Sequence, residues 1–289
     1  MQGHDEFERG EKRQESGTRP KPLRPGTTGP QVYAGARHRA GTGAERLRLS
    51  RGWPLRWARG WLSTQRLWHT LLPSACALCG VVQAEVVCAG CADDLLATVA
   101  RCPQCALRTP RGRPCDACMA APTPIDAACT VGDYAAPQDQ LVLALKAGAA
   151  LPLARWFAEA LAARVAGSAM ALPDLLVPVP LSPQRLATRG FNQAWEIARP
   201  LARLLGVAAD ATLLARRRDT VSQRVLDLAA RQANLHGALT MTRTTTLAGR
   251  HVGIVDDVMT TGATLREAAL VLKAHGAARV TVLPALRTP

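Results

Sequence analysis

The chain of 289 residues is 20% charged, 48% hydrophobic and 4% aromatic, which excludes a collagen-like chain and a wholly disordered one. Its formal net charge is +14, and the first 70 residues carry much of it, with 14 basic against 6 acidic side chains. This balance favours polyanionic partners such as nucleic acid, nucleotides or anionic lipid, and the length predicts about two domains.

Residues 1–50 predict a disordered basic tail, because they are rich in Gly, Arg, Thr and Glu and show almost no apolar periodicity. The first 30 residues lack the apolar core of a signal peptide, and the chain contains no uncharged apolar run of about 18 residues. We therefore expect no transmembrane segment and a cytoplasmic protein.

Residues 51–73 predict an amphipathic Trp/Arg helix. Trp53, Trp57 and Trp61 recur at every fourth position, and arginines lie between them. Such a helix can lie on an anionic membrane or in the groove of a partner. Packing of the tryptophan stripe against the chain's own next domain is the interpretation we favour.

Residues 74–122 contain four Cys-x-x-Cys turns, a spacing that predicts a double zinc ribbon. Each turn places two thiolates on one side of a metal, so two turns complete a closed structural Zn²⁺ site, and the region would hold one or two such ions. Sequential pairing gives the ligand sets Cys76, Cys79, Cys88, Cys91 and Cys102, Cys105, Cys115, Cys118. Crossed pairing, redox-active thiols and buried structural cysteines are the alternatives, and the ninth cysteine, Cys129, is expected to be a small core residue.

Residues 126–289 alternate helical patterns rich in Ala, Leu and Val with short apolar runs, which is typical of an α/β domain with a parallel sheet. We predict strands at 127–134, 175–179, 251–255 and 279–286, and helices at 138–147, 152–165, 183–205 and 264–275. Gly276 is expected to cap the last helix. An Arg-rich stretch covers 216–236.

The most informative run follows the third predicted strand and reads Asp256-Asp257-Val258-Met259-Thr260-Thr261-Gly262-Ala263-Thr264. Gly and small hydroxyl residues at the carboxyl end of a parallel strand let backbone N–H groups converge on a phosphate, and the following helix adds its positive end. Two carboxylates just before such a loop can accept hydrogen bonds from the vicinal hydroxyls of a sugar, directly or through Mg²⁺. The alternative is a capped helix start with two solvent-facing acids.

This run resembles the phosphoribosyl diphosphate (PRPP) motif of type I phosphoribosyltransferases. The four cysteine pairs, the segment Val177-Pro178-Val179-Pro180-Leu181 and the run Arg189-Gly190-Phe191-Asn192-Gln193-Ala194 resemble the ComF/GntX family, as does the segment from Gln223 to Asn234. The resemblance covers residues 71–289, and the Arg-Gly-Phe-Asn-Gln run is its most family-specific part.

The resemblance implies an open parallel sheet with helices on both faces, which is the type I phosphoribosyltransferase fold, behind the zinc ribbon. It matches Asp256 and Asp257, as catalytic acids, to the ribose hydroxyls and residues 260–264 to the 5′-phosphate loop, and it places Val258 and Met259 in the same PRPP-binding run. It also matches Arg185, Arg189 and Arg218 to pyrophosphate or another anion, and implies Mg²⁺ bound together with PRPP or a related nucleotide. Members of this family are bacterial proteins linked to competence and DNA uptake.

Two functions follow from the resemblance. One is a phosphoribosyltransferase that uses PRPP in DNA uptake or nucleotide-linked metabolism. The sequence ends at Pro289, directly after the last predicted strand, and no separate hood for an acceptor base is recognised, so either the zinc ribbon serves as the hood or the fold binds without transfer. The alternative is a non-catalytic factor that binds single-stranded DNA or competence proteins through its zinc ribbons and arginines.

Overall fold

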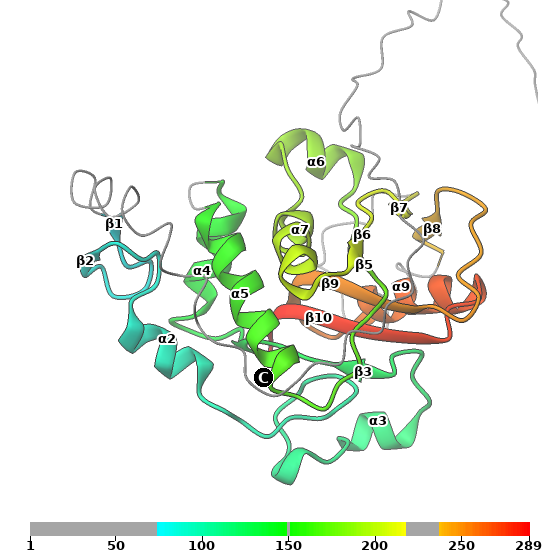
Figure 1. Cartoon of the computed structure of the whole chain (residues 1–289), viewed down its shortest axis with the longest axis horizontal. Helices are drawn as coiled ribbons and strands as arrows, with labels where there is room; N and C mark the ends of the chain where they lie inside the picture. The colour runs from blue at the N-terminus through cyan, green and yellow to red at the C-terminus, as the bar shows by residue number, and fades with distance from the viewer. Residues whose placement is uncertain (1–73, 149–150, 218–236) are drawn as a thin grey trace, which may run out of the picture. The chain divides into compact units, whose positions relative to one another are not determined.

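The computed structural model describes residues 74–148, 151–217 and 237–289, so the predicted tail of residues 1–50 and the predicted helix of residues 51–73 lie outside it. The cysteine-rich region contributes two short strands, two helices and a 3₁₀ turn (Figure 1): β1 (Ser74–Ala75), β2 (Val82–Gln83), α2 (Ala89–Leu96), η1 (Pro110–Gly112) and α3 (Asp116–Ala120). None of the described helices has the length and hydropathy that spanning a bilayer requires.

A six-stranded parallel sheet forms the centre of the α/β region. Its strands are β3 (Ala127–Ala128), β4 (Gly132–Asp133), β5 (Leu175–Pro178), β6 (Ala208–Ala209), β9 (His251–Met259) and β10 (Arg279–Arg287). The order is β3-β10-β9-β5-β6, and β4 also pairs with β10. Strands β9 and β10 pair from His251 with Arg279 to Met259 with Arg287, so their carboxyl ends reach the same edge of the sheet.

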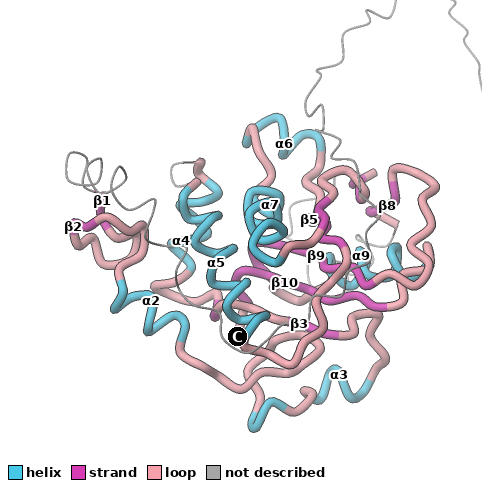
Figure 2. Tube along the Cα trace, viewed as in Figure 1, coloured by secondary structure: helices cyan, strands magenta, loops and turns pink. Residues whose placement is uncertain are grey.

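Helices cover both faces of this sheet (Figure 2): α4 (Asp139–Lys146), α5 (Pro152–Ala166), α7 (Gln193–Leu205) and α9 (Ala263–Ala274). Helix α6 (Pro183–Arg189), which follows β5, buries none of its residues. Successive side chains of a strand point to opposite faces, and this alternation creates two cores. Leu176 and Val255 pack with α4, α5 and α7, whereas Val177 and Ile254 pack with α9. The predicted fold class, an open parallel sheet with helices on both faces, is confirmed.

Three predicted elements are wrong in their extent. The helix predicted at 183–205 is divided into α6 and α7, because Gly190 ends α6 in a left-handed backbone conformation (φ +79°) and the Asn192 side chain caps α7 by accepting the N–H of Ala194 at 3.0 Å. The strand predicted at 127–134 is two separate two-residue strands, β3 and β4, which pair successively along β10.

Strand β9 continues past its predicted end at Val255 to Met259, so Asp256 and Asp257 lie within the strand. The antiparallel hairpin of β7 (Leu214–Arg216) and β8 (Leu239–Met241) was not predicted. Residues 218–236, which include Arg218, connect β7 to β8 in the sequence and lie outside the described residues. The other predicted helices and strands are confirmed, with differences of one or two residues at their ends.

Candidate functional site

A cleft of about 580 Å³ opens at the carboxyl edge of β5 and β9. Its lining contains all nine residues predicted from Asp256 to Thr264 and also Arg185 and Arg189, so the structure brings the predicted phosphate loop and two predicted arginines to one site. Two further lining residues, Tyr134 and Lys146, were not predicted to belong to it.

The two acids occupy the part of β9 that enters the cleft. Asp256 Oδ1 accepts the N–H of Asp257 at 2.9 Å, and Asp257 Oδ1 accepts the N–H of Val258 at 2.7 Å. Burial and the neighbouring Asp257 carboxylate raise the pKa of Asp256 well above its ordinary value. A nearby divalent cation would favour the ionised form of Asp256, and carboxylate oxygens are ligands that Mg²⁺ accepts.

Lys146 joins these acids from a different element. Its Nζ lies 3.1 Å from Asp257 Oδ2, and the two side chains are 30% and 14% exposed. Lys146 is the last residue of α4, where a cation also suits the negative end of the helix. The contact with Asp257 could not be seen in the sequence, although the scarcity of lysine, with four in the chain, marked the position as unusual.

The turn from Thr260 to Gly262 connects β9 to α9, and we call residues 260–264 the phosphate loop. Gly262 has φ +76°, and a Cβ added to it would lie 2.5 Å from Met259 Cε, so this position requires glycine. The N–H of Ala263 donates to Thr261 Oγ1 at 3.4 Å, and the first N–H groups of a helix have no partner inside the helix. Such donors, together with the helix dipole, are groups that favour an anion.

Met259 was predicted as part of the phosphate site. Its side chain is 2% exposed and belongs to the core that α9 covers. Met259 therefore packs against the loop at Gly262 from the side of the core.

A second wall of the cleft follows β5. Ser182 Oγ caps α6 by accepting the N–H of Arg185 at 3.3 Å, and Asn192 Nδ2 donates to the carbonyl of Val179 at 3.0 Å. Arg189 Nη1 donates to Gln193 Oε1 at 2.8 Å. Arg185 is exposed, and its guanidinium has no hydrogen-bond or ion-pair partner among the residues that the structure describes, so it is the arginine of this wall most available to an anion.

Arg287, the last residue of β10, was not predicted from the sequence to lie beside this site. Arg287 is 9% exposed, and its Nη1 lies 3.2 Å from the carbonyl oxygen of Met259 and also donates to the carbonyl of Thr260. Its Nε donates to the carbonyl of Cys105 at 3.0 Å. No sequence signal distinguished this arginine from the others, because three of its four acceptors are backbone carbonyls far away in the chain and the fourth is the carbonyl of the adjacent Thr288.

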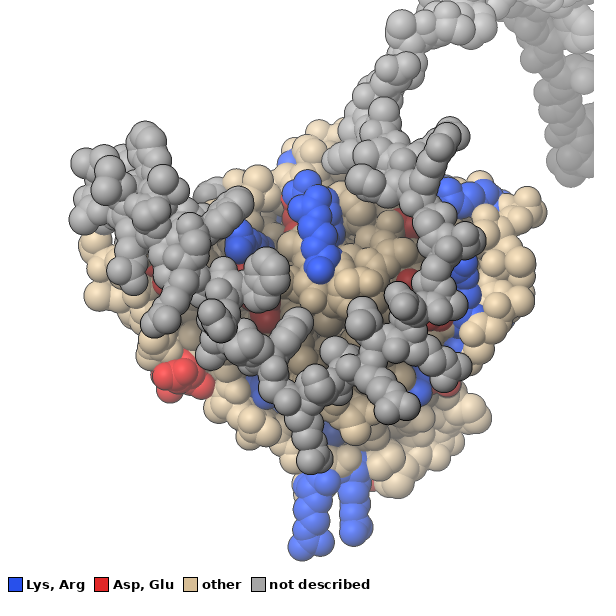
Figure 3. Space-filling view, viewed as in Figure 1, with Lys and Arg blue, Asp and Glu red and all other residues tan. Residues whose placement is uncertain are grey.

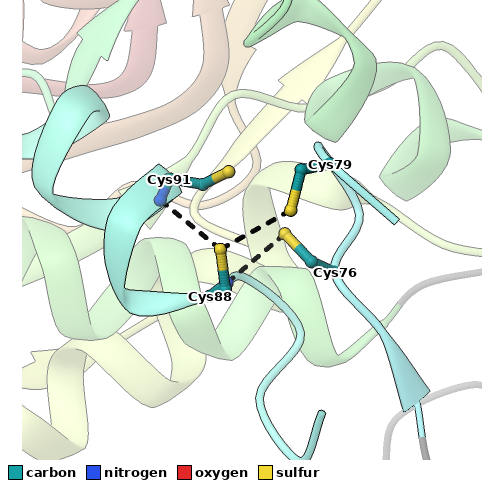
Figure 4. A group of neighbouring side chains, drawn as sticks. All are labelled: Cys76, Cys79, Cys88 and Cys91. Atoms are coloured by element: carbon teal, nitrogen blue, oxygen red, sulfur yellow. Dashed lines mark hydrogen bonds between the residues drawn. The ribbon is translucent and has the colours of Figure 1, made fainter. Parts of the chain in front are cut away.

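The eight paired cysteines gather into the two sequential groups of four, so crossed pairing is excluded. In each group the four sulfur atoms lie within 4.8 Å of one another, and Figure 4 shows the first group. A tetrahedral ion with Zn–S bonds of about 2.3 Å places its sulfur ligands about 3.8 Å apart. The Sγ atoms of Cys79 and Cys88 are 3.6 Å apart, as are those of Cys105 and Cys115, so both groups fit Zn²⁺.

The protonation of the sulfurs supports the same assignment. Burial alone would raise the pKa of Cys76, but N–H donors of Cys79, Cys88 and Leu78 outweigh it and lower the pKa to about 6. Hydrogen bonding to Cys88, followed by burial, raises the pKa of Cys91 to about 12. Four sulfurs in such a group cannot all ionise without a cation, and Zn²⁺ supplies that charge.

Cys129 stands apart from both groups. It is half-buried against the core that α5 and α7 cover, and burial raises the pKa of its thiol to about 11. The prediction of a small core residue is confirmed in its packing, although Cys129 lies between β3 and β4 and not within a strand.

Comparison with known proteins agrees with both regions. The phosphoribosyl transferase domain matches residues 191–285, and the double zinc ribbon domain matches residues 67–119. Among solved structures, a hypoxanthine phosphoribosyltransferase from Staphylococcus aureus shares 13% identity at a TM-score of 0.32, covering 47% of this chain and 64% of that one, a likeness too slight to build on.

Two curated relatives are closer in sequence. The chain is 37% identical over 227 residues to the DNA utilization protein YhgH of Salmonella typhi, covering 75% of this chain and 98% of that protein. It is 35% identical over 112 residues to Competence protein F of Haemophilus influenzae, covering 38% of this chain and 49% of that protein. With both domains matched and a relative aligned over nearly its whole length, the chain belongs to the ComF/GntX family, in which a double zinc ribbon precedes a phosphoribosyltransferase domain.

Proposed function

We propose that this protein binds PRPP with Mg²⁺ in the cleft between β5 and β9 and acts in DNA utilization in the cytoplasm, the process that the names of its relatives denote. The observation that carries the proposal is the single cleft that holds the whole run from Asp256 to Thr264 together with Arg185 and Arg189. Phosphate, sugar and pyrophosphate would each meet groups of suitable chemistry there.

Different residues of the cleft would bind different parts of PRPP. The N–H groups of the phosphate loop and the start of α9 would hold the 5′-phosphate. The carboxylates of Asp256 and Asp257 would accept hydrogen bonds from the ribose hydroxyls or hold Mg²⁺, which supplies positive charge to the pyrophosphate when bound. Arg185 would meet the pyrophosphate oxygens, for which a guanidinium is well suited.

Calorimetric titration of the full chain with PRPP and Mg²⁺ tests the binding. We expect Asp256→Asn combined with Asp257→Asn to weaken binding by about tenfold or more, because both charged acceptors are lost. Glu159→Gln is the matched control, since Glu159 is an exposed acid of α5 whose salt bridge with Arg155 contributes little. Equal affinity of wild type and the double variant, or no binding by wild type, would overturn the proposal.

We further propose that binding leads to transfer of the phosphoribosyl group. In that reaction the bond from the anomeric carbon to the pyrophosphate oxygen breaks, a bond from that carbon to an acceptor forms, and pyrophosphate leaves with the electron pair. Developing charge on the leaving group would be stabilised by Arg185 and by Mg²⁺. An assay of pyrophosphate release over a panel of nucleobases tests transfer. If the protein binds PRPP but releases no pyrophosphate with any acceptor, it is a ligand-binding protein and not a transferase.

The alternative is binding of single-stranded DNA, which the net charge of +14 favours. On the face drawn in Figure 3, outside the grey atoms, Lys and Arg side chains lie at separate positions and do not form one continuous stripe. Outside the grey atoms, this face therefore offers no continuous basic track for a single strand. A steep loss of affinity for single-stranded DNA with rising salt, unaffected by PRPP, would support the alternative.

A further inference from the structure

Arg287 connects two regions that the sequence places far apart. Its guanidinium donates to the carbonyl of Thr260 in the phosphate loop and lies 3.2 Å from the carbonyl oxygen of Met259 just before the loop. The same group donates through Nε to the carbonyl of Cys105 at 3.0 Å. One planar, buried cation thus holds the backbone of the phosphate loop and the backbone of a cysteine in the second zinc group.

The position of the Cys105 carbonyl depends on its own side chain. Cys105 Sγ belongs to the second group of four sulfurs, and Cys105 also packs against the core that α9 covers. A metal bound by these sulfurs fixes the Cys105 side chain and with it the local backbone. Without the metal the turn keeps its core packing and the hydrogen bond from the Ala128 N–H to the Pro103 carbonyl at 2.7 Å, but it loses the bond at Sγ. The acceptor that Arg287 uses is therefore ordered when the second site is filled.

The second zinc ribbon, which contains Cys102, Cys105, Cys115 and Cys118, also contacts another segment that borders the cleft. Arg101 Nη1 lies 2.7 Å from Asp133 Oδ1, and Arg108 also pairs with Asp133. The residue that follows, Tyr134, lines the cleft. Two of the segments that border the ligand site are thus attached to the second ribbon.

The first ribbon is attached differently. Cys91 and Leu96 pack against the opposite core, and Arg164 of α5 donates to the carbonyl of Leu96 at 2.7 Å. Among the residues that the structure describes, none of the four cysteines of this group is hydrogen-bonded to the phosphate loop. The two zinc groups therefore differ in their connection to the site, although they are built alike.

We propose that Arg287 is a positioning residue that makes the geometry of the phosphate loop depend on zinc at the second site, Cys102, Cys105, Cys115 and Cys118, and not on zinc at the first. The inference rests on the proposed function for its consequence, which is that filling the second site strengthens PRPP binding. The coupling itself is a property of the ligand-free chain and can be measured without PRPP.

Amide hydrogen exchange of the full chain tests the coupling. We expect Cys118→Ser to speed exchange at the phosphate loop by about tenfold, while the amides of Val177 and Ile254 in the sheet keep their protection. Cys91→Ser is the matched control, because it removes a ligand of the first site, and it should leave exchange at the loop unchanged. Zinc analysis verifies that each variant has lost one ion.

Arg287→Lys tests the bridge without touching a metal ligand. Lysine keeps the charge but cannot direct two separate donors to the carbonyls of Cys105 and Thr260, so we expect both zinc ions to stay and the loop to exchange about as fast as in Cys118→Ser. A double variant with Cys118→Ser and Arg287→Lys should exchange at the phosphate loop about as fast as either single variant, because both substitutions break the same connection. Additive effects, or equal effects of Cys91→Ser and Cys118→Ser on the loop, would overturn the inference.

Titration with PRPP and Mg²⁺ separates the two proposals. If wild type binds PRPP, we expect Cys118→Ser and Arg287→Lys to weaken binding by about tenfold and Cys91→Ser to change it by less than about twofold. If wild type does not bind PRPP, the proposed function fails, while the exchange measurements still decide whether Arg287 couples the second zinc site to the loop.

Discussion

Lys146 Nζ lies 3.1 Å from Asp257 Oδ2, and this ion pair links the last residue of α4 to the pair of acids on β9. The lysine stands where two carboxylates side by side would otherwise repel each other. It lowers the pKa of Asp256, although burial and Asp257 outweigh it.

Lys146→Met is therefore expected to weaken the binding of PRPP with Mg²⁺ by about tenfold, since it removes a cation from an anion site and raises the pKa of Asp256 further. Calorimetric titration measures this, and Lys146→Arg should recover part of the affinity. Wild-type affinity in Lys146→Met would show that the ion pair has no part in binding.

Gly262→Ala should distort the phosphate loop. The new Cβ meets Met259 Cε at 2.5 Å at a position whose φ is +76°. Gly206→Ala is the matched control, because Gly206 has φ +70° with no atom within 4 Å of an added Cβ, and it should lose about 1 kcal/mol of unfolding free energy without a change in PRPP affinity. We expect a larger loss for Gly262→Ala in urea unfolding, together with weaker binding, and equal losses would contradict the role of the Met259 contact.

Metal analysis of the purified chain should find two zinc ions. Cys129→Ser should keep both, because the raised pKa of this thiol, about 11, and its place outside both groups leave it no part in metal binding. Cys115→Ser should retain one ion and lower the thermal midpoint, since each ribbon depends on its metal for folding energy. One ion in wild type, or a loss of zinc in Cys129→Ser, would contradict the assignment.

Asn192 has two contacts that substitutions can separate. Asn192→Ala removes both the cap on the N–H of Ala194 and the bond to the carbonyl of Val179, and should cost about 1 to 2 kcal/mol in urea unfolding. Asn192→Asp keeps the cap but places a negative oxygen against the Val179 carbonyl oxygen, so we expect a loss of unfolding free energy from this repulsion and weaker PRPP binding. An aspartate variant that binds PRPP normally would show that the contact with Val179 does not shape the cleft.

His251 should make the stability of the fold depend on pH. Burial, and after it the charge of Arg279, lowers the pKa of His251 below its ordinary 6.5, while its ring nitrogens contact the carbonyl of Leu172 and the hydroxyl of Thr281. The unfolded chain then binds more protons than the folded chain just below pH 6.5, so stability is complete above that pH and falls as the pH drops through the window.

Urea midpoints at about pH 7.5 and about pH 5.5 check this effect. His251→Gln removes the titrating ring, so its midpoint should fall less between the two conditions than that of wild type, and the acid release of zinc is common to both chains. An identical fall in the two proteins would contradict the assignment.

Local sequence signals predicted the parts of the site that are continuous in the chain. The run from Asp256 to Thr264 and the Cys-x-x-Cys turns contain their chemistry within a few residues, and the structure places the first in one cleft and the second in two metal groups. Residues such as Lys146 and Arg287 were missed because their partners are brought near only by the sheet order. The break in the helix predicted at 183–205 was readable in part, since Gly190 and Asn192 are residues that end and begin helices.

The ribbons also close the hydrophobic interior of the larger region. Cys91 and Leu96 lie against one side of the sheet and Cys105 against the other, so each metal group covers apolar surface on its own side. A chain shortened to begin at residue 126 would expose apolar surface on both sides of the sheet, and exposed apolar surface promotes aggregation. Chelation during purification is therefore expected to lower the solubility of the chain as well as to loosen the phosphate loop.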